Sequence, residues 1–208
     1  MDIKTVIFDL GGVCFTDSVQ YFAMKIHDKY DIPPQQIFSI FTGELGTKYI
    51  KGEITLNDFW NVAKQQLRIN ESNDTLTELY LGGMRPIEGT IDVIKELRAN
   101  GYETLFLSDN VKDAIDHLQK KYKFADNFDD GLYSHQIGIR KPNPILYQCL
   151  LKKTKSEPKQ CVYIDDKPLY LEPAKDMGML TTHFVNPTSL REALYFAGLK
   201  INPHVKKM

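Results

Sequence analysis

Long apolar runs, cysteine and excess charge are all scarce in this chain of 208 residues. No stretch approaches the roughly 18 apolar residues that a membrane-spanning helix needs, so we expect no membrane span. The 26 basic and 27 acidic side chains leave a formal net charge of −1. Such a balance gives no reason to expect nucleic acid or an anionic membrane as a partner.

The three cysteines, Cys14, Cys149 and Cys161, lack the spacing of a metal site. Two of them lie in or near apolar runs, so we expect buried free thiols in a reducing compartment. The first residues do not resemble a signal peptide, because Asp2 and Lys4 flank a short run that ends on an acid. We therefore expect a cytoplasmic protein.

What the chain does contain is typical of a globular protein. Hydrophobic residues make up 42% and charged residues 25% of it, which excludes a disordered chain. Its length suits one large domain or a domain with an insertion.

The stretch from Thr5 to Gly12 is the most informative. A mostly apolar run ends on Asp9, and Gly11 and Gly12 follow. This pattern predicts a buried parallel strand that opens into a tight loop at its carboxyl end. Ligands of open α/β sheets bind at such ends, and glycines let the backbone approach a ligand. The alternative is an ordinary turn with Asp as a turn residue.

Three later stretches have a similar character. An apolar run ends on Ser108, Lys141 precedes Pro142, and a further apolar run ends on Asp165 and Asp166. Each residue has an ordinary interpretation as well. Ser108 or the paired acids would serve as helix N-caps, and a loop lysine is normally just solvated.

Taken in order, Asp9, Ser108, Lys141 and the pair Asp165-Asp166 resemble the motifs of the haloacid dehalogenase-like (HAD) superfamily. The long gap between Asp9 and Ser108 resembles members with a helical cap inserted after the first strand, subfamily I (IA). The resemblance implies a Rossmann-like α/β fold with a parallel five-stranded sheet in the order 3-2-1-4-5. Residues 1–16 and 86–208 would form the core domain, and residues 17–85 the cap domain.

The local patterns predict where the elements lie. Helical periodicity and capping signals predict helices over 19–30, 35–42, 56–67, 72–81, 90–100, 109–121 and 144–153, and a last helix capped from Ser189. Further strands are predicted over 102–108, 128–134, 161–165 and 180–185. His135 is predicted in a loop, and Phe59 and Trp60 in the core of the cap rather than in a substrate cage. Asp17-Ser18, Gly82-Gly83 and Pro86 are the predicted hinges.

The resemblance implies a Mg²⁺-dependent phosphatase of a small phosphorylated metabolite. The Asp-Leu-Gly-Gly variant of the motif at residues 9–12 resembles sugar-phosphate phosphatases, so a sugar phosphate is the expected kind of substrate. Asp9 would be the nucleophile, forming an aspartyl-phosphate that water hydrolyses. Asp9, Asp165, Asp166 and the Gly11 carbonyl would bind the Mg²⁺ ion, which prefers oxygen ligands. By the same resemblance, the substrate would be held by Gly11, Gly12, Ser108, Asp109 and Lys141, and Lys141 would also be catalytic.

The chain departs from the family at two positions. Most phosphatases of this kind have an acid/base Asp where this chain has Gly11, and losing such a group costs about 10²–10⁴-fold. Three outcomes are open. The substrate has a good leaving group, as in a sugar 1-phosphate; another acid such as Asp17, Glu44 or Glu53 replaces the missing one; or turnover is poor. The second departure is Asp109, where an Asn is frequent and a carboxylate would repel phosphate unless it points at the cap or at a substrate hydroxyl.

Three other functions are compared with the phosphatase interpretation on the basis of the same residues. A dehalogenase also uses an Asp nucleophile, but its metal-free site has no use for Asp165 and Asp166. A non-catalytic or weakly active protein that binds a phosphorylated ligand is the main alternative, with Gly11 as its argument. A mutase needs the acid/base that Gly11 lacks. The substrate and the oligomeric state are left open by the sequence.

Overall fold

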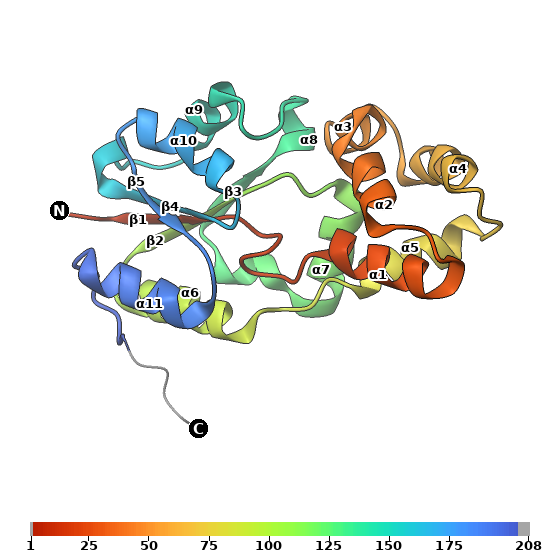
Figure 1. The fold of residues 1–208 in the computed structure, drawn as a ribbon. Helices are drawn as coiled ribbons and strands as arrows, with labels where there is room; N and C mark the ends of the chain where they lie inside the picture. The colour runs from red at the N-terminus through yellow and green to blue at the C-terminus, as the bar shows by residue number, and fades with distance from the viewer. Residues whose placement is uncertain (1, 204–208) are drawn as a thin grey trace.

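A single parallel sheet organises the chain (Figure 1). The computed structural model describes residues 2–203. Its strands are β1 Thr5–Phe8, β2 Glu103–Ser108, β3 Asp130–Tyr133, β4 Cys161–Asp165 and β5 Leu180–His183. They pair in parallel in the order β3-β2-β1-β4-β5, which confirms the predicted fold class and strand order. Because β1 is the central strand, Asp9 emerges from the middle of the sheet.

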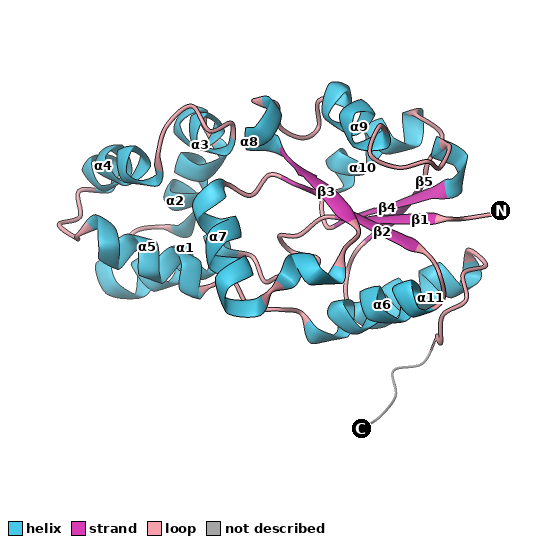
Figure 2. Ribbon diagram, turned by 180° about the vertical axis from the view of Figure 1, so that it is seen from behind, coloured by secondary structure: helices cyan, strands magenta, loops and turns pink. Residues whose placement is uncertain are grey.

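Helices cover both faces of the sheet (Figure 2). On one side lie α6 Glu88–Ala99 and α11 Pro187–Phe196, and on the other α9 Pro144–Leu151 and α10 Pro168–Asp176. Successive side chains of a strand point to opposite faces, so Val6 and Phe8 join one apolar cluster and Ile7 the other. Both faces of β1 are therefore buried, which explains its apolar sequence.

Five helices form an insert between β1 and α6. They are α1 Ser18–Tyr30, α2 Pro34–Thr42, α3 Glu44–Ile50, α4 Leu56–Leu67 and α5 Asn73–Gly82, called the helical insert below. Figure 1 shows them gathered beyond the carboxyl ends of the strands. Trp60 is 1% exposed and packs on Phe22, Phe41, Phe59 and Tyr80. The prediction that Phe59 and Trp60 lie in the core of this bundle is confirmed.

The two connections to the helical insert run side by side. The Thr16 N–H donates to the Arg85 carbonyl at 2.9 Å, and the Ile87 N–H donates to the Cys14 carbonyl at 2.8 Å. Asp17 caps α1 by accepting from the N–H groups of Val19 and Gln20. The division into core and cap domains, and the hinge role of these residues, stay predictions.

Three local predictions are wrong. The helix after β2 is α7 Lys112–Tyr122 and does not begin at Asp109, because that carboxylate is bonded to other loops. His135 lies in the short helix α8 Ser134–Ile137 rather than in a loop. The last helix begins at Pro187 and is capped by Asn186 instead of Ser189, a Pro and Asn arrangement typical of helix starts.

Other differences concern boundaries. Strands β3 and β5 are shorter than predicted, α6 begins earlier, and α9 ends at Leu151. The sequence reasoning also missed α10, which carries Pro168 in its first turn and Pro173 inside it. Two short 3₁₀ helices complete the description, Phe124–Asn127 and Pro158–Gln160.

The cysteines are free, with Cys14 and Cys161 buried and Cys149 half-buried. Within residues 2–203, no helix combines the length and the apolar character needed to cross a membrane.

Candidate active site

Asp9 is the first residue after the central strand. Its N–H donates to the Ile164 carbonyl at 2.9 Å, which ties it to the neighbouring strand β4. The residue is only 5% exposed. Burial, against the opposing charge of Lys141 and together with the Asp165 carboxylate, raises the pKa of Asp9 to about 7. Asp9 therefore carries a carboxylate that is held away from bulk water and needs a cation nearby.

Lys141 supplies part of that positive charge. Its Nζ lies 2.8 Å from Asp9 Oδ1 and 2.7 Å from Asp165 Oδ2, and the residue is 2% exposed. Burial lowers the pKa of Lys141, but Asp9, Asp165 and Asp109 outweigh this effect and raise the pKa well above its usual value. The lysine is therefore a fixed ammonium between two carboxylates.

Asp165 and Asp166 follow one another but differ in their surroundings. Asp165 Oδ2 accepts from Lys141 and, at 2.6 Å, from the Tyr163 hydroxyl, while Oδ1 accepts from the Lys167 N–H at 2.9 Å. By contrast, Asp166 Oδ1 is buried and has no hydrogen-bond partner among residues 2–203. Burial also raises the pKa of Asp166. Asp165 is thus satisfied by the protein, whereas Asp166 is left with a free oxygen.

Gly12 makes room for the Asp166 carboxylate. Its φ of 84° lies in the left-handed region, which glycine adopts without strain. A Cβ at this position would lie 2.5 Å from Asp166 Oδ2. Any larger residue would therefore push Asp166 away from the loop that carries Asp9.

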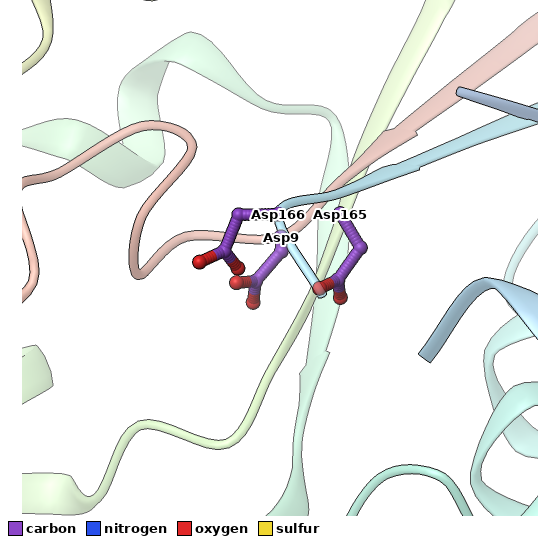
Figure 3. Close-up of side chains that lie close together, drawn as sticks. All are labelled: Asp9, Asp165 and Asp166. Carbon is purple, nitrogen blue, oxygen red and sulfur yellow. The ribbon is translucent and has the colours of Figure 1, made fainter. Parts of the chain in front are cut away.

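The three carboxylates form one cluster at the ends of β1 and β4 (Figure 3). Asp9, Asp165 and Asp166 each offer an oxygen, and these oxygens lie within 4.8 Å of one another. Hard carboxylate oxygens are the ligands that Mg²⁺ prefers, and a buried carboxylate oxygen without a partner is costly unless a cation meets it. The free oxygen of Asp166 therefore fits a bound Mg²⁺ ion.

Ser108 and Gly11 lie beside this cluster. Ser108 ends β2, is 1% exposed, and its Oγ accepts from the Asn110 N–H at 3.1 Å. Ser108 and Gly11 line the same cavity as Asp9 and Lys141. A Cβ added at Gly11 would meet no atom within 4 Å, so the position has space for a side chain.

Asp109 is held by hydrogen bonds and an ion pair within the protein. Its Oδ1 accepts from the Ser134 hydroxyl and, at 3.1 Å, from the Lys141 N–H. Its Oδ2 lies 3.5 Å from Arg140 Nε. Asp109 lines the cavity, so its contact with substrate stays a prediction, but these bonds give it a clear role in holding the loop of Lys141.

Sequence reasoning overlooked several residues of this site. Tyr163 bonds Asp165 from two positions earlier on β4, where the alternation of a strand puts both on one face. Lys167, directly after the paired acids, lines the cavity with Tyr170. Burial lowers the pKa of Lys167, but Asp9 and Asp166 outweigh it and raise the pKa. The signal in the sequence was a lysine adjacent to two acids.

None of the three suggested replacement acids is free beside Asp9. Asp17 lines the cavity, but its Oδ1 caps α1, accepting from the N–H groups of Val19 at 2.8 Å and Gln20 at 3.2 Å. Glu44 pairs with Lys48 and Glu53 with Lys51, and both acids are exposed. Neither glutamate lines the cavity.

The cavity itself has a volume of about 300 Å³. It lies between the carboxyl ends of the strands and the helical insert, and both parts contribute to its walls. Arg140, next to Lys141, donates to Thr47 Oγ1 of α3 at 3.0 Å. This contact joins the helical insert to the loop that carries the lysine.

A profile of the haloacid dehalogenase-like hydrolases matches residues 3–178. The chain belongs to this family. The matched residues include Asp9, Asp165 and Asp166. Membership of this family classifies the chain as a hydrolase. Subfamily IA and the Asp-Leu-Gly-Gly variant remain expectations from the sequence.

Relatives at low identity include phosphatases. The chain is 23% identical over 185 residues to sesquiterpene phosphatase astK of Aspergillus oryzae, covering 88% of this chain and 90% of that protein. It is 28% identical over 105 residues to glyceraldehyde 3-phosphate phosphatase of Methanocaldococcus jannaschii, covering 49% and 45%. It is 25% identical over 215 residues to mouse bifunctional epoxide hydrolase 2, covering 92% of this chain but 38% of that longer protein.

Solved structures share the fold. A HAD-like family hydrolase from Porphyromonas gingivalis superposes with a TM-score of 0.75 at 20% identity, covering 95% of this chain and 98% of that one. A HAD family enzyme from Bacteroides thetaiotaomicron, in complex with magnesium and inorganic phosphate, gives 0.71 at 19% identity, covering 88% and 95%.

Proposed function

We propose that this protein is a Mg²⁺-dependent phosphatase that hydrolyses a small phosphorylated metabolite through an aspartyl-phosphate on Asp9. The observation that carries the proposal is the convergence of Asp9, Ser108, Lys141, Asp165 and Asp166 on one end of the sheet, where Asp9, Ser108 and Lys141 line the wall of one cavity. A phosphate monoester is a dianion, so its hydrolysis depends on charge neutralisation and positioning.

Each residue has a role in this proposal. Asp9 attacks phosphorus, and the Lys141 ammonium and the Ser108 hydroxyl hold phosphoryl oxygens. A Mg²⁺ ion, when bound, offsets the repulsion between the Asp9 carboxylate and the phosphate. Among the expected ligands Asp9, Asp165, Asp166 and the Gly11 carbonyl, Asp166 has the free oxygen, while Asp165 holds Lys141 in place.

The relatives support the proposal, but their names do not agree on one substrate. Two of the three are phosphatases by name, and the B. thetaiotaomicron neighbour was crystallised with magnesium and phosphate. The cluster of three acids disfavours a dehalogenase, because a metal-free site would leave Asp166 Oδ1 unsatisfied.

One observation favours a second candidate, a protein that binds a phosphorylated ligand with little turnover. Gly11 offers no general acid, and of the three replacement acids considered, only Asp17 lines the cavity, where it caps a helix. A leaving group with a high pKa would then depart slowly.

Hydrolysis of p-nitrophenyl phosphate separates the two candidates. Its leaving group is good, so the absence of an acid at position 11 should matter little. We expect turnover that requires Mg²⁺ and that falls to background in Asp9→Asn, while Asp2→Asn, at an exposed surface position, keeps wild-type activity. Circular dichroism checks that both variants fold. A folded wild type that binds Mg²⁺ but turns over no phosphoester would refute the phosphatase proposal and leave the binding protein.

A further inference from the structure

The cavity above Asp9 has two different ends. The end formed by the core carries the polar groups described above, Asp9, Ser108 and Lys141 among them. The end formed by the helical insert is mostly apolar and is lined by Phe38, Phe41, Tyr49, Ile50, Tyr80 and Met84. Small-molecule pockets of about 300–1,000 Å³ typically combine such an apolar wall with a few polar anchors.

Most polar groups of the insert end already have partners within the protein. Asp17 Oδ1 accepts from the backbone N–H groups of Val19 and Gln20. The Thr42 hydroxyl donates to the Phe38 carbonyl at 2.8 Å, and the Thr16 hydroxyl donates to the Gly83 carbonyl. A sugar buried here would find few free partners for its hydroxyl groups, and an unpaired buried hydroxyl is costly.

Tyr49 is the exception at this end. The residue is 3% exposed, and its hydroxyl is buried without a hydrogen-bond partner in the described part of the chain. This hydroxyl oxygen is too enclosed for a ligand in the cavity to reach it, so Tyr49 contributes its ring to the wall and offers no hydrogen bond to a ligand.

From these walls we propose that the ligand of this site is a phosphate monoester with a predominantly apolar organic group, which fills the insert end. The inference rests on the proposed function for the position of the phosphate. It replaces the expectation of a sugar phosphate with a different substrate class.

Binding of alkylphosphonates tests the ligand class independently of turnover. We would titrate the wild-type protein with butyl-, hexyl-, octyl- and decylphosphonate in the presence of Mg²⁺ by calorimetry. Burying apolar surface predicts that Kd falls by about fourfold per added methylene until the cavity is full. Equal Kd values along the series, or tighter binding of a sugar phosphonate, would overturn the proposal.

Two variants of α3 provide a matched pair. Ile50 and Leu45 are both partly buried against the same apolar cluster, but only Ile50 lines the cavity. Ile50→Gln should reduce the gain in affinity with chain length, and Leu45→Gln should leave it unchanged. The same loss in both variants would show a general weakening of the insert and contradict the proposed position of the alkyl chain.

Hydrolysis separates this proposal from the phosphatase proposal. Chain-length-dependent binding of phosphonates without turnover of any phosphoester would keep the ligand class and refute the phosphatase. Turnover of p-nitrophenyl phosphate with a preference for sugar phosphates over octyl phosphate would keep the phosphatase and refute the ligand class.

Discussion

At the scale of single residues, Gly11 is unusual because it provides no general acid, although the structure has space for a side chain at this position. A Cβ there would meet nothing within 4 Å, and its φ is outside the left-handed region. The neighbouring Gly12 is the opposite case, since its φ of 84° and the Asp166 carboxylate both require glycine. The backbone conformation and the nearby carboxylate therefore require glycine at position 12, whereas position 11 has space for a side chain.

Replacing Gly11 by Asp should add the missing general acid. We expect Gly11→Asp to raise kcat/KM for an alkyl phosphate by at least about tenfold, a part of the roughly 10²–10⁴-fold that a well-placed general acid contributes. Activity on p-nitrophenyl phosphate, which needs little protonation, should change much less. Steady-state kinetics on both substrates measure the difference, with Gly11→Ala as the steric control. An equal gain on both substrates would point to an effect other than protonation of the leaving group.

Asp109 allows a second test at this scale. Its Oδ1 accepts from Ser134 and from the Lys141 N–H, and an asparagine oxygen can accept both. Asp109→Asn should therefore keep most activity, while Asp109→Ala should lose at least about tenfold, because a buried donor left unpaired costs about 1–3 kcal/mol. Activity and thermal melting of the two variants decide this. Equal losses in both would show that the negative charge, and not the hydrogen bonds, is what matters.

At the scale of elements, the helical insert and the core meet through few polar contacts near the site. Arg140 bonds Thr47 of α3 at 3.0 Å and lies 3.5 Å from Asp109. The residue after it is Lys141, so one loop contacts both the insert and the carboxylates. Any motion of α3 relative to the core would therefore shift the position of Lys141.

Removing the Arg140 contact should loosen the insert over the cavity. We expect Arg140→Gln to raise KM several-fold with a smaller change in kcat, because the variant keeps Lys141 but loses the link to α3. Arg68→Gln, at an exposed position of the insert, should behave as the wild type. Thr47→Ala should reproduce part of the effect. A change confined to kcat would instead assign Arg140 to the chemical step.

At the scale of the whole molecule, one apolar cluster extends from the sheet into the helical insert. Phe8 of β1 and Trp60 of α4 belong to the same cluster, so folding of the two parts is coupled by burial. Against this gain stands the cluster of Asp9, Asp165 and Asp166, of which only Asp9 and Asp165 form ion pairs with Lys141. Buried charge without full compensation lowers stability, so a bound cation should stabilise the whole fold.

Thermal melting with and without Mg²⁺ measures this effect. At about 100-fold excess over Kd, binding adds about 2.7 kcal/mol, which predicts a rise of about 5–10 °C in Tm for a chain of this size. Asp166→Asn should remove most of this rise and should melt higher than the wild type without Mg²⁺, because it removes an uncompensated carboxylate. Sodium chloride at matched ionic strength is the control. A variant with the full Mg²⁺ shift would exclude Asp166 as a ligand.

The local patterns of the sequence determined much of the fold. Apolar runs that end on Asp9, Ser108 and Asp165 predicted three strands correctly, because a strand buried on both faces has a distinctive composition. Thr55 and Asp58 form a capping box at the start of α4, a pattern that neighbouring residues of the sequence specify by themselves. The strand order came from the family resemblance, which rests on the order of these same residues.

Only the tertiary structure decided the contacts between distant residues. The bonds of Asp109 to Ser134, of Lys141 to both Asp9 and Asp165, and of Arg140 to Thr47 join residues far apart in the chain, and no local pattern encodes them. The same holds for the free oxygen of Asp166 and for the apolar wall of the cavity. Burial and pairing depend on what the folded chain brings together, so the sequence determined the elements and their chemistry, and packing decided which groups are satisfied and which are left to bind a ligand.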